Sequence, residues 1–142
     1  MHSVRHKDIV FRGQQNQSVP LRILSFNLET RVRSDMVFMP YHTTAEMPVI
    51  QIGNIMQMGF GCTACTYRII FTLQGCTEIP GAEVRSFPTE ASMLLAWREF
   101  IMMSDPDLIT GHNIACFNFV YLLFRAEVLR LSSFACLGRL KG

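Results

Sequence analysis

Apolar and polar residues alternate along the segment that follows Pro20, and this alternation predicts a β-strand. Leu24, Phe26 and Leu28 are apolar, and the positions between them carry polar side chains. A period of two places the apolar side chains on one face of a strand and the polar ones on the other. We therefore expect a strand over residues 22–29 that packs on one side only.

Further strands are expected downstream. Residues 48–55 and 67–73 are rich in β-branched and aromatic side chains, which favour strands. Shorter strands are expected near 84–87 and over 107–110, and a turn at 111–113 follows the second of these.

Two helices complete the predicted domain. Thr89 is a suitable N-cap for a helix over residues 90–103, in which apolar residues recur on one face, and Trp97 on that face is expected in the core. A second, strongly apolar helix is expected over residues 117–131. Its solvent-exposed side is marked by three charged residues: Arg125, Glu127 and Arg130. Three strands, a helix, a strand and a helix predict an α/β fold, with a mixed sheet and helices packed on it.

Composition limits the class of protein. The chain has 142 residues, of which 49% are hydrophobic and 17% charged, so we expect one folded domain over residues 21–142 after a polar, aperiodic segment at 1–20. A net charge of +2 does not by itself indicate binding to nucleic acid or to a membrane. No apolar run approaches the ~20 residues that span a bilayer, and no signal peptide is evident, so we expect a soluble intracellular protein.

The cysteines do not indicate a metal or redox site. Five cysteines without a secretory signal are expected to be reduced thiols. Cys62 and Cys65 have the C-x-x-C spacing of half a zinc site, but a tetrahedral site needs four ligands and no second such motif exists. Cys76, His42 or His112 would join them only by coincidence, so we interpret the motif as a loop.

Two segments resemble motifs of a known family. Leu24–Glu29 reads Leu-Ser-Phe-Asn-Leu-Glu, and Gly111–Leu122 reads Gly-His-Asn-Ile-Ala-Cys-Phe-Asn-Phe-Val-Tyr-Leu. They resemble the motifs Leu-Ser-Phe-Asp-Ile-Glu and Gly-Tyr-Asn-x-x-x-Phe-Asp-x-Pro-Tyr-Leu in the 3′→5′ proofreading exonuclease domain of family B DNA polymerases, most closely those of the delta type. Three stretches between them also follow the family order and spacing: 48–52, 95–98 and 105–109.

The resemblance implies a ribonuclease H-like fold and a nuclear DNA replication protein. In the family, four acidic residues hold two Mg²⁺ ions, and a metal-activated water cleaves the terminal phosphodiester of a primer 3′ end. Asn27, Glu29 and Asn118 stand at three of these catalytic and metal-binding positions. The implied partners are single-stranded DNA or a primer 3′ end, and other polymerase subunits.

Further residues stand at positions that the resemblance places against DNA. These are Leu28, Asn113 and Phe117. His112 and Val120 depart from the family motif, which has Tyr and Pro at these positions.

The chain departs from the family pattern at the residues that would hold the metal ions. Both motif aspartates are asparagines, Asn27 and Asn118, and a neutral amide oxygen is a weaker ligand for a hard cation than a carboxylate. The third family motif, Tyr-x-x-x-Asp, is not found in the 142 residues, so we expect a C-terminally incomplete domain with no Mg²⁺ or a weakly bound one.

Three hypotheses follow. The first is a catalytically silent exonuclease-like domain that binds single-stranded DNA weakly. The second is an active nuclease in which Glu29, Asp105 or Asp107 builds a rearranged metal site. The third is an interaction module that binds or competes for a surface of a polymerase.

Overall fold

The computed structural model describes residues 20–31, 47–59 and 67–139. Five strands, two α-helices and one π-helical turn, η2, make up this part of the chain. In sequence order they are β1 (Arg22–Thr30), β2 (Val49–Met58), β3 (Tyr67–Leu73), β4 (Glu83–Phe87), α1 (Glu90–Ser104), β5 (Leu108–Thr110), η2 (Ile114–Asn118) and α2 (Phe119–Val128). The predicted α/β class is confirmed, and each predicted strand and the first helix lie within a few residues of their expected bounds.

The strands form one mixed sheet with the order β4-β3-β2-β1-β5. β1 pairs antiparallel with β2 and parallel with β5. β2 and β3 are antiparallel, whereas β3 and β4 are parallel. This mixed sheet with helices packed on it is the arrangement expected of a ribonuclease H-like exonuclease fold, and β1 lies inside it with a neighbour on each side.

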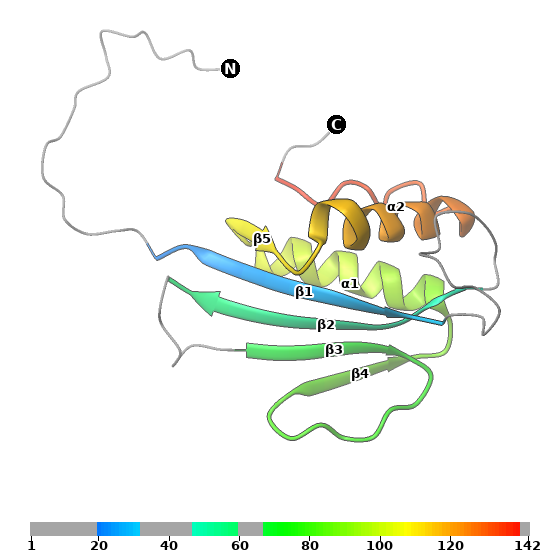
Figure 1. The fold of residues 1–142 in the computed structure, drawn as a ribbon, viewed down its shortest axis with the longest axis horizontal. Helices are drawn as coiled ribbons and strands as arrows, with labels where there is room; N and C mark the ends of the chain where they lie inside the picture. Colours follow the sequence, from blue (N-terminus) through cyan, green and yellow to red (C-terminus); the bar gives the residue numbers. More distant parts are fainter. Residues whose placement is uncertain (1–19, 32–46, 60–66, 140–142) are drawn as a thin grey trace, which may run out of the picture.

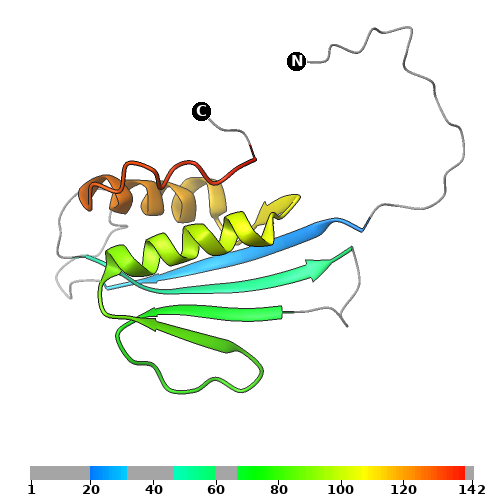
Figure 2. The ribbon, with the colours of Figure 1, turned by 180° about the vertical axis from the view of Figure 1, so that it is seen from behind.

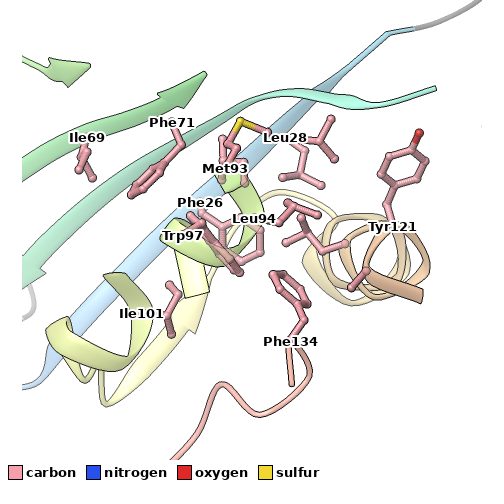
Figure 3. Packing of buried hydrophobic residues seen from close by; sticks show 14 of the residues in the cluster. Phe26, Leu28, Ile69, Phe71, Met93, Leu94, Trp97, Ile101, Tyr121 and Phe134 are labelled. Carbon is pink, nitrogen blue, oxygen red and sulfur yellow. The ribbon is translucent and has the colours of Figure 1, made fainter. Parts of the chain in front are cut away.

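Both helices pack on the same face of the sheet, α2 beside α1 (Figures 1 and 2). Figure 3 shows the core that they enclose, in which side chains from β1, β3, α1 and α2 meet Phe134 from the C-terminal segment. Leu24, Phe26 and Leu28 are all buried in this core, which confirms the predicted alternation along β1.

Trp97 is fully buried, as predicted, and its indole Nε1 donates a hydrogen bond to Asn54 Oδ1 at 2.9 Å. The amide of Asn54 in turn donates to the carbonyl oxygens of Ile52 and Ile69. These bonds join α1 to β2 and β3 and satisfy the buried polar side chains of Trp97 and Asn54.

The prediction for the second helix was wrong in two respects. Instead of one helix over 117–131, the chain forms the η2 turn from Ile114 and then α2, which ends at Val128. Arg125, expected on the exposed side, is 1% exposed, because its guanidinium forms an ion pair with Glu90 at the start of α1. Glu90 Oε1 also accepts a hydrogen bond from the Val49 N–H, so the pair links α2, α1 and β2.

None of the helices in the described ranges is long and apolar enough to cross a membrane. Cys62, Cys65 and most of the predicted leading segment lie outside the described residues.

Candidate active site at the junction of β1 and α2

β1 carries two polar candidate residues on the face that points away from the helices. Asn27 and Glu29 are both exposed. Leu28, which lies between them, and Phe26, which precedes Asn27, are buried. Residues two apart on a strand lie about 7 Å from each other and point the same way. The alternation that buries the core residues therefore also presents Asn27 and Glu29 together.

A glycine lets the chain after β5 come close to β1. A Cβ atom built on Gly111 would lie 2.3 Å from the Phe26 carbonyl oxygen, which is closer than any side chain allows. Asn113, two residues later, adopts a left-handed conformation with φ 51° and ψ 35° and begins the η2 turn. Glycine at 111 thus allows the second motif to reach the backbone of the first.

The η2 turn sets the position of Asn118. The Asn113 carbonyl oxygen accepts hydrogen bonds from the N–H groups of Phe117, at 2.9 Å, and Asn118, at 3.4 Å. A turn of this wide type often occurs at functional sites, because one added residue changes which side chains point inward. Here the Asn118 side chain is completely buried against β1.

The structure brings Asn27 and Asn118 together, as the motif spacing predicts. Asn118 Nδ2 lies 3.3 Å from Asn27 Oδ1, to which it donates a hydrogen bond. It also donates to the carbonyl oxygens of Phe26 at 3.3 Å and His112 at 3.2 Å. The roles of Asn27, Glu29 and Asn118 in catalysis or metal binding stay predictions.

The junction does not fit a catalytic Mg²⁺ ion. Mg²⁺ prefers anionic oxygen ligands, and Asn118 instead turns its NH₂ group toward the surrounding oxygens. Its Oδ1 atom is buried and accepts no hydrogen bond from the described part of the chain. Across the described ranges, no three His, Cys, Asp or Glu side chains cluster where they could hold a metal ion.

Residues predicted to contact DNA have different exposures. Asn113 is exposed, and Phe117 is half-buried with its ring 5.5 Å from that of Tyr121. The Leu28 side chain is only 5% exposed and belongs to the core, so a DNA strand would meet its backbone rather than its side chain. DNA contact by these three residues stays a prediction.

Asp105 and Asp107 cannot serve as substitute ligands beside Glu29. Asp107 lies next to Arg22 at the start of β1: the Arg22 N–H donates to Asp107 Oδ2 at 2.9 Å, and the Asp107 N–H donates to the Arg22 carbonyl oxygen at 2.8 Å. Glu29 is seven residues further along this strand, which corresponds to about 23 Å. The hypothesis of a rearranged metal site built from these aspartates is therefore wrong.

The two aspartates instead form ion pairs with two arginines. Arg139 pairs with Asp105 at 2.5 Å and with Asp107 at 2.8 Å, and Arg22 also pairs with both. The hydrogen bond from Arg139 lowers the pKa of Asp105 below its ordinary value, and the backbone N–H of Arg22 does the same for the pKa of Asp107. This network fastens the C-terminal segment to the edge of the sheet.

A hollow of about 490 Å³ lies beside Asn27 on the face of the sheet opposite the two helices. Its polar lining includes Ser25, Asn27, Arg68 and His112. The sequence reasoning missed Arg68, although the alternation of Ile69 and Phe71 toward the core places Arg68 and Ile70 on the opposite face. The hollow thus brings the Arg68 guanidinium and the Asn27 amide together beside the candidate site.

Comparison with known proteins identifies the family to which the chain is similar. The family described as DNA polymerase family B, exonuclease domain, matches residues 2–142. The DNA polymerase delta catalytic subunit of Oryza sativa subsp. japonica is 43% identical over 91% of this chain, and those of Dictyostelium discoideum and Candida albicans are 39% and 37% identical over 94% and 98%. The matched region is 11–13% of the length of these three relatives.

Proposed function

The chain belongs to the exonuclease-domain family of the family B DNA polymerases, and we propose that it keeps the fold of that domain without its hydrolytic activity. The proposed molecule is a nuclear protein that binds single-stranded DNA or a primer 3′ end weakly. Its partners would be DNA and subunits of a polymerase, and it would bind Mg²⁺ weakly or not at all.

The Asn118 amide is the observation that carries the proposal of inactivity. Two-metal hydrolysis requires anionic oxygens that hold the cations and generate a hydroxide near neutral pH. At this position the chain supplies a hydrogen-bond donor, whose NH₂ group occupies the space between three oxygens. Asn27 accepts one of those hydrogen bonds and is also an amide. Glu29 is therefore the one carboxylate among the three matched positions.

Weak DNA binding is supported by the surface around Asn27. Arg68 and His112 line the hollow there, and Phe117 is only half-buried. An aromatic ring that stacks on a base is typically worth ~1–3 kcal/mol. Because the net charge is only +2, few phosphates would be neutralised, and the affinity should depend only mildly on salt concentration.

The second hypothesis, an active nuclease, is tested by degradation of a 3′-labelled single strand in Mg²⁺ or Mn²⁺. We expect no degradation above that in EDTA, alongside a positive control with an established 3′→5′ exonuclease. Cleavage by the purified chain that Glu29→Ala abolishes would overturn the proposal. Cleavage that persists in Glu29→Ala would indicate a contaminating nuclease, and the preparation would be repurified before the assay is scored.

Binding is measured separately, by fluorescence anisotropy of a labelled single strand. We expect weak binding that Phe117→Ala weakens further and that Val120→Ala, an exposed change on the neighbouring helix α2, leaves unchanged. Tight, salt-resistant binding that is equal in the wild type and in Phe117→Ala would contradict the proposed mode. No binding at all would favour the third hypothesis, an interaction module.

A further inference from the structure

The buried Asn118 side chain joins three parts of the chain. Its NH₂ group has two hydrogens, and three oxygens lie within 3.3 Å of the nitrogen. Phe26 and Asn27 supply two of these oxygens from β1, and His112 supplies the third from the loop that precedes η2. The amide therefore fastens the start of α2 to β1.

The surroundings decide which way the amide points. Rotating it by 180° would place Oδ1 among three acceptors, with no hydrogen to share. In the observed orientation, Oδ1 is buried and accepts no hydrogen bond from the residues that the structure describes. The surroundings of position 118 therefore require a hydrogen-bond donor and provide no partner for a hydrogen-bond acceptor.

A carboxylate at this position would be unfavourable in the bare protein. One oxygen would face the three acceptors, and the other would occupy the position of Oδ1, which has no donor. An ionised group that is buried without a partner is strongly destabilising. A divalent cation between the oxygens would remove this repulsion, since anionic oxygens bind Mg²⁺.

We propose that the Asn27–Asn118 amide pair fastens β1 to the start of α2 through hydrogen bonds that need no metal ion, in place of the carboxylate–metal contacts that the family pattern implies at these positions. This inference rests on the proposed metal-free site. It concerns the folding equilibrium, which is measured without any assay of hydrolysis.

Replacing each of the two asparagines by aspartate should have different effects on stability. Asn27 is exposed and acts as an acceptor, so an aspartate there keeps the hydrogen bond and leaves its charge in water. Asn118 is completely buried and acts as a donor, so an ionised aspartate there loses all three bonds. A general effect of added negative charge would not distinguish the two positions.

The test is urea unfolding in EDTA of the wild type, Asn27→Asp and Asn118→Asp. We expect the folding equilibrium constant of Asn118→Asp to fall at least about tenfold, because an unsatisfied buried group costs at least this much. Asn27→Asp should stay within about threefold of the wild type, as surface substitutions usually do. Mg²⁺ should restore most of the stability that the Asn27→Asp, Asn118→Asp double variant loses. It should leave the stability of the wild type unchanged.

A matched control is Asn54→Asp, another buried amide that donates to two carbonyl oxygens. It should be destabilised as well but not recovered by Mg²⁺, because Asn54 is on the core side of the sheet. If Asn118→Asp does not fold, Asn118→Ala provides the comparison: it should lose stability, and adding Asn27→Ala should cost little more.

Wild-type stability in Asn118→Asp without metal would overturn the proposed link, as would equal recovery of Asn54→Asp by Mg²⁺. Either result would leave the proposed lack of hydrolysis standing. Conversely, hydrolysis by the wild type would refute the proposed function, while the unfolding comparison would still decide whether the amides form the link.

Discussion

The buried ion pair between Glu90 and Arg125 gives the clearest prediction for stability. Glu90 Oε1 accepts hydrogen bonds of 2.8 Å from the Val49 N–H and from Arg125 Nε, and Oε2 accepts one of 2.5 Å from Arg125 Nη2. Glu90 and Arg125 are 8% and 1% exposed. Arg125→Met would leave the Glu90 carboxylate in the core with one of these three donors.

The expected loss follows from this burial. Removing one partner of a buried pair typically costs 3–5 kcal/mol, because the other charge stays buried without compensation. For a chain of this size, each kcal/mol lowers the melting temperature by about 3 °C, so a decrease of roughly 10 °C is expected. The Glu90→Leu, Arg125→Met double variant should recover much of the loss, since it leaves no charge to compensate.

The assay is urea and thermal unfolding followed by far-ultraviolet circular dichroism. Arg85→Met is the matched control, because Arg85 pairs with Glu83 at the surface, where both side chains are more than two-fifths exposed. Exposed pairs contribute about 0–1 kcal/mol, so this control should unfold nearly like the wild type. A loss below about 1 kcal/mol in Arg125→Met, no greater than that in the control, would refute the assignment of Arg125 to the core.

Three further predictions concern single residues. Gly111→Ala should cost about 1–3 kcal/mol in urea unfolding, because its Cβ would meet the Phe26 carbonyl oxygen at 2.3 Å; unchanged stability would contradict that close approach. Trp97→Phe should cost about 1–3 kcal/mol, since it leaves Asn54 Oδ1 without its donor; a loss within error would contradict this hydrogen bond. Asp105 has a lowered pKa, so its pairing with Arg139 stabilises the fold above its unfolded pKa, and this contribution is lost as the pH falls through the folded value. Arg139→Gln should therefore lower the melting temperature more at pH 7 than at pH 2, and equal effects at both pH values would contradict the ion pair.

The local pattern of apolar and polar residues was sufficient to predict most helices and strands of the fold. The alternation of Leu24, Phe26 and Leu28 reflects a strand with one buried face, and it also predicts the exposure of Asn27 and Glu29. The fully buried Trp97 follows from helical periodicity in the same way. These features depend on residues a few positions apart.

Features that depend on distant partners were not predictable. Arg125 is buried because Glu90, 35 residues earlier, lies opposite it, and a charged residue in a helix pattern gives no sign of this pairing. The separation of Asp107 from Glu29 follows from the parallel register of β1 and β5. The donor role of Asn118 depends on backbone oxygens from two other segments, so the sequence indicated a lost ligand but not the hydrogen bonds that replace it.

The central claim is that no catalytic metal ion assembles at the junction of β1 and α2. Titration of the purified chain with Mn²⁺, with the free ion followed by electron paramagnetic resonance, tests this most directly. We predict no stoichiometric binding at millimolar Mn²⁺, and the same weak background in Glu29→Ala as in the wild type. Saturable binding of one or two Mn²⁺ ions per chain that Glu29→Ala removes would contradict the account.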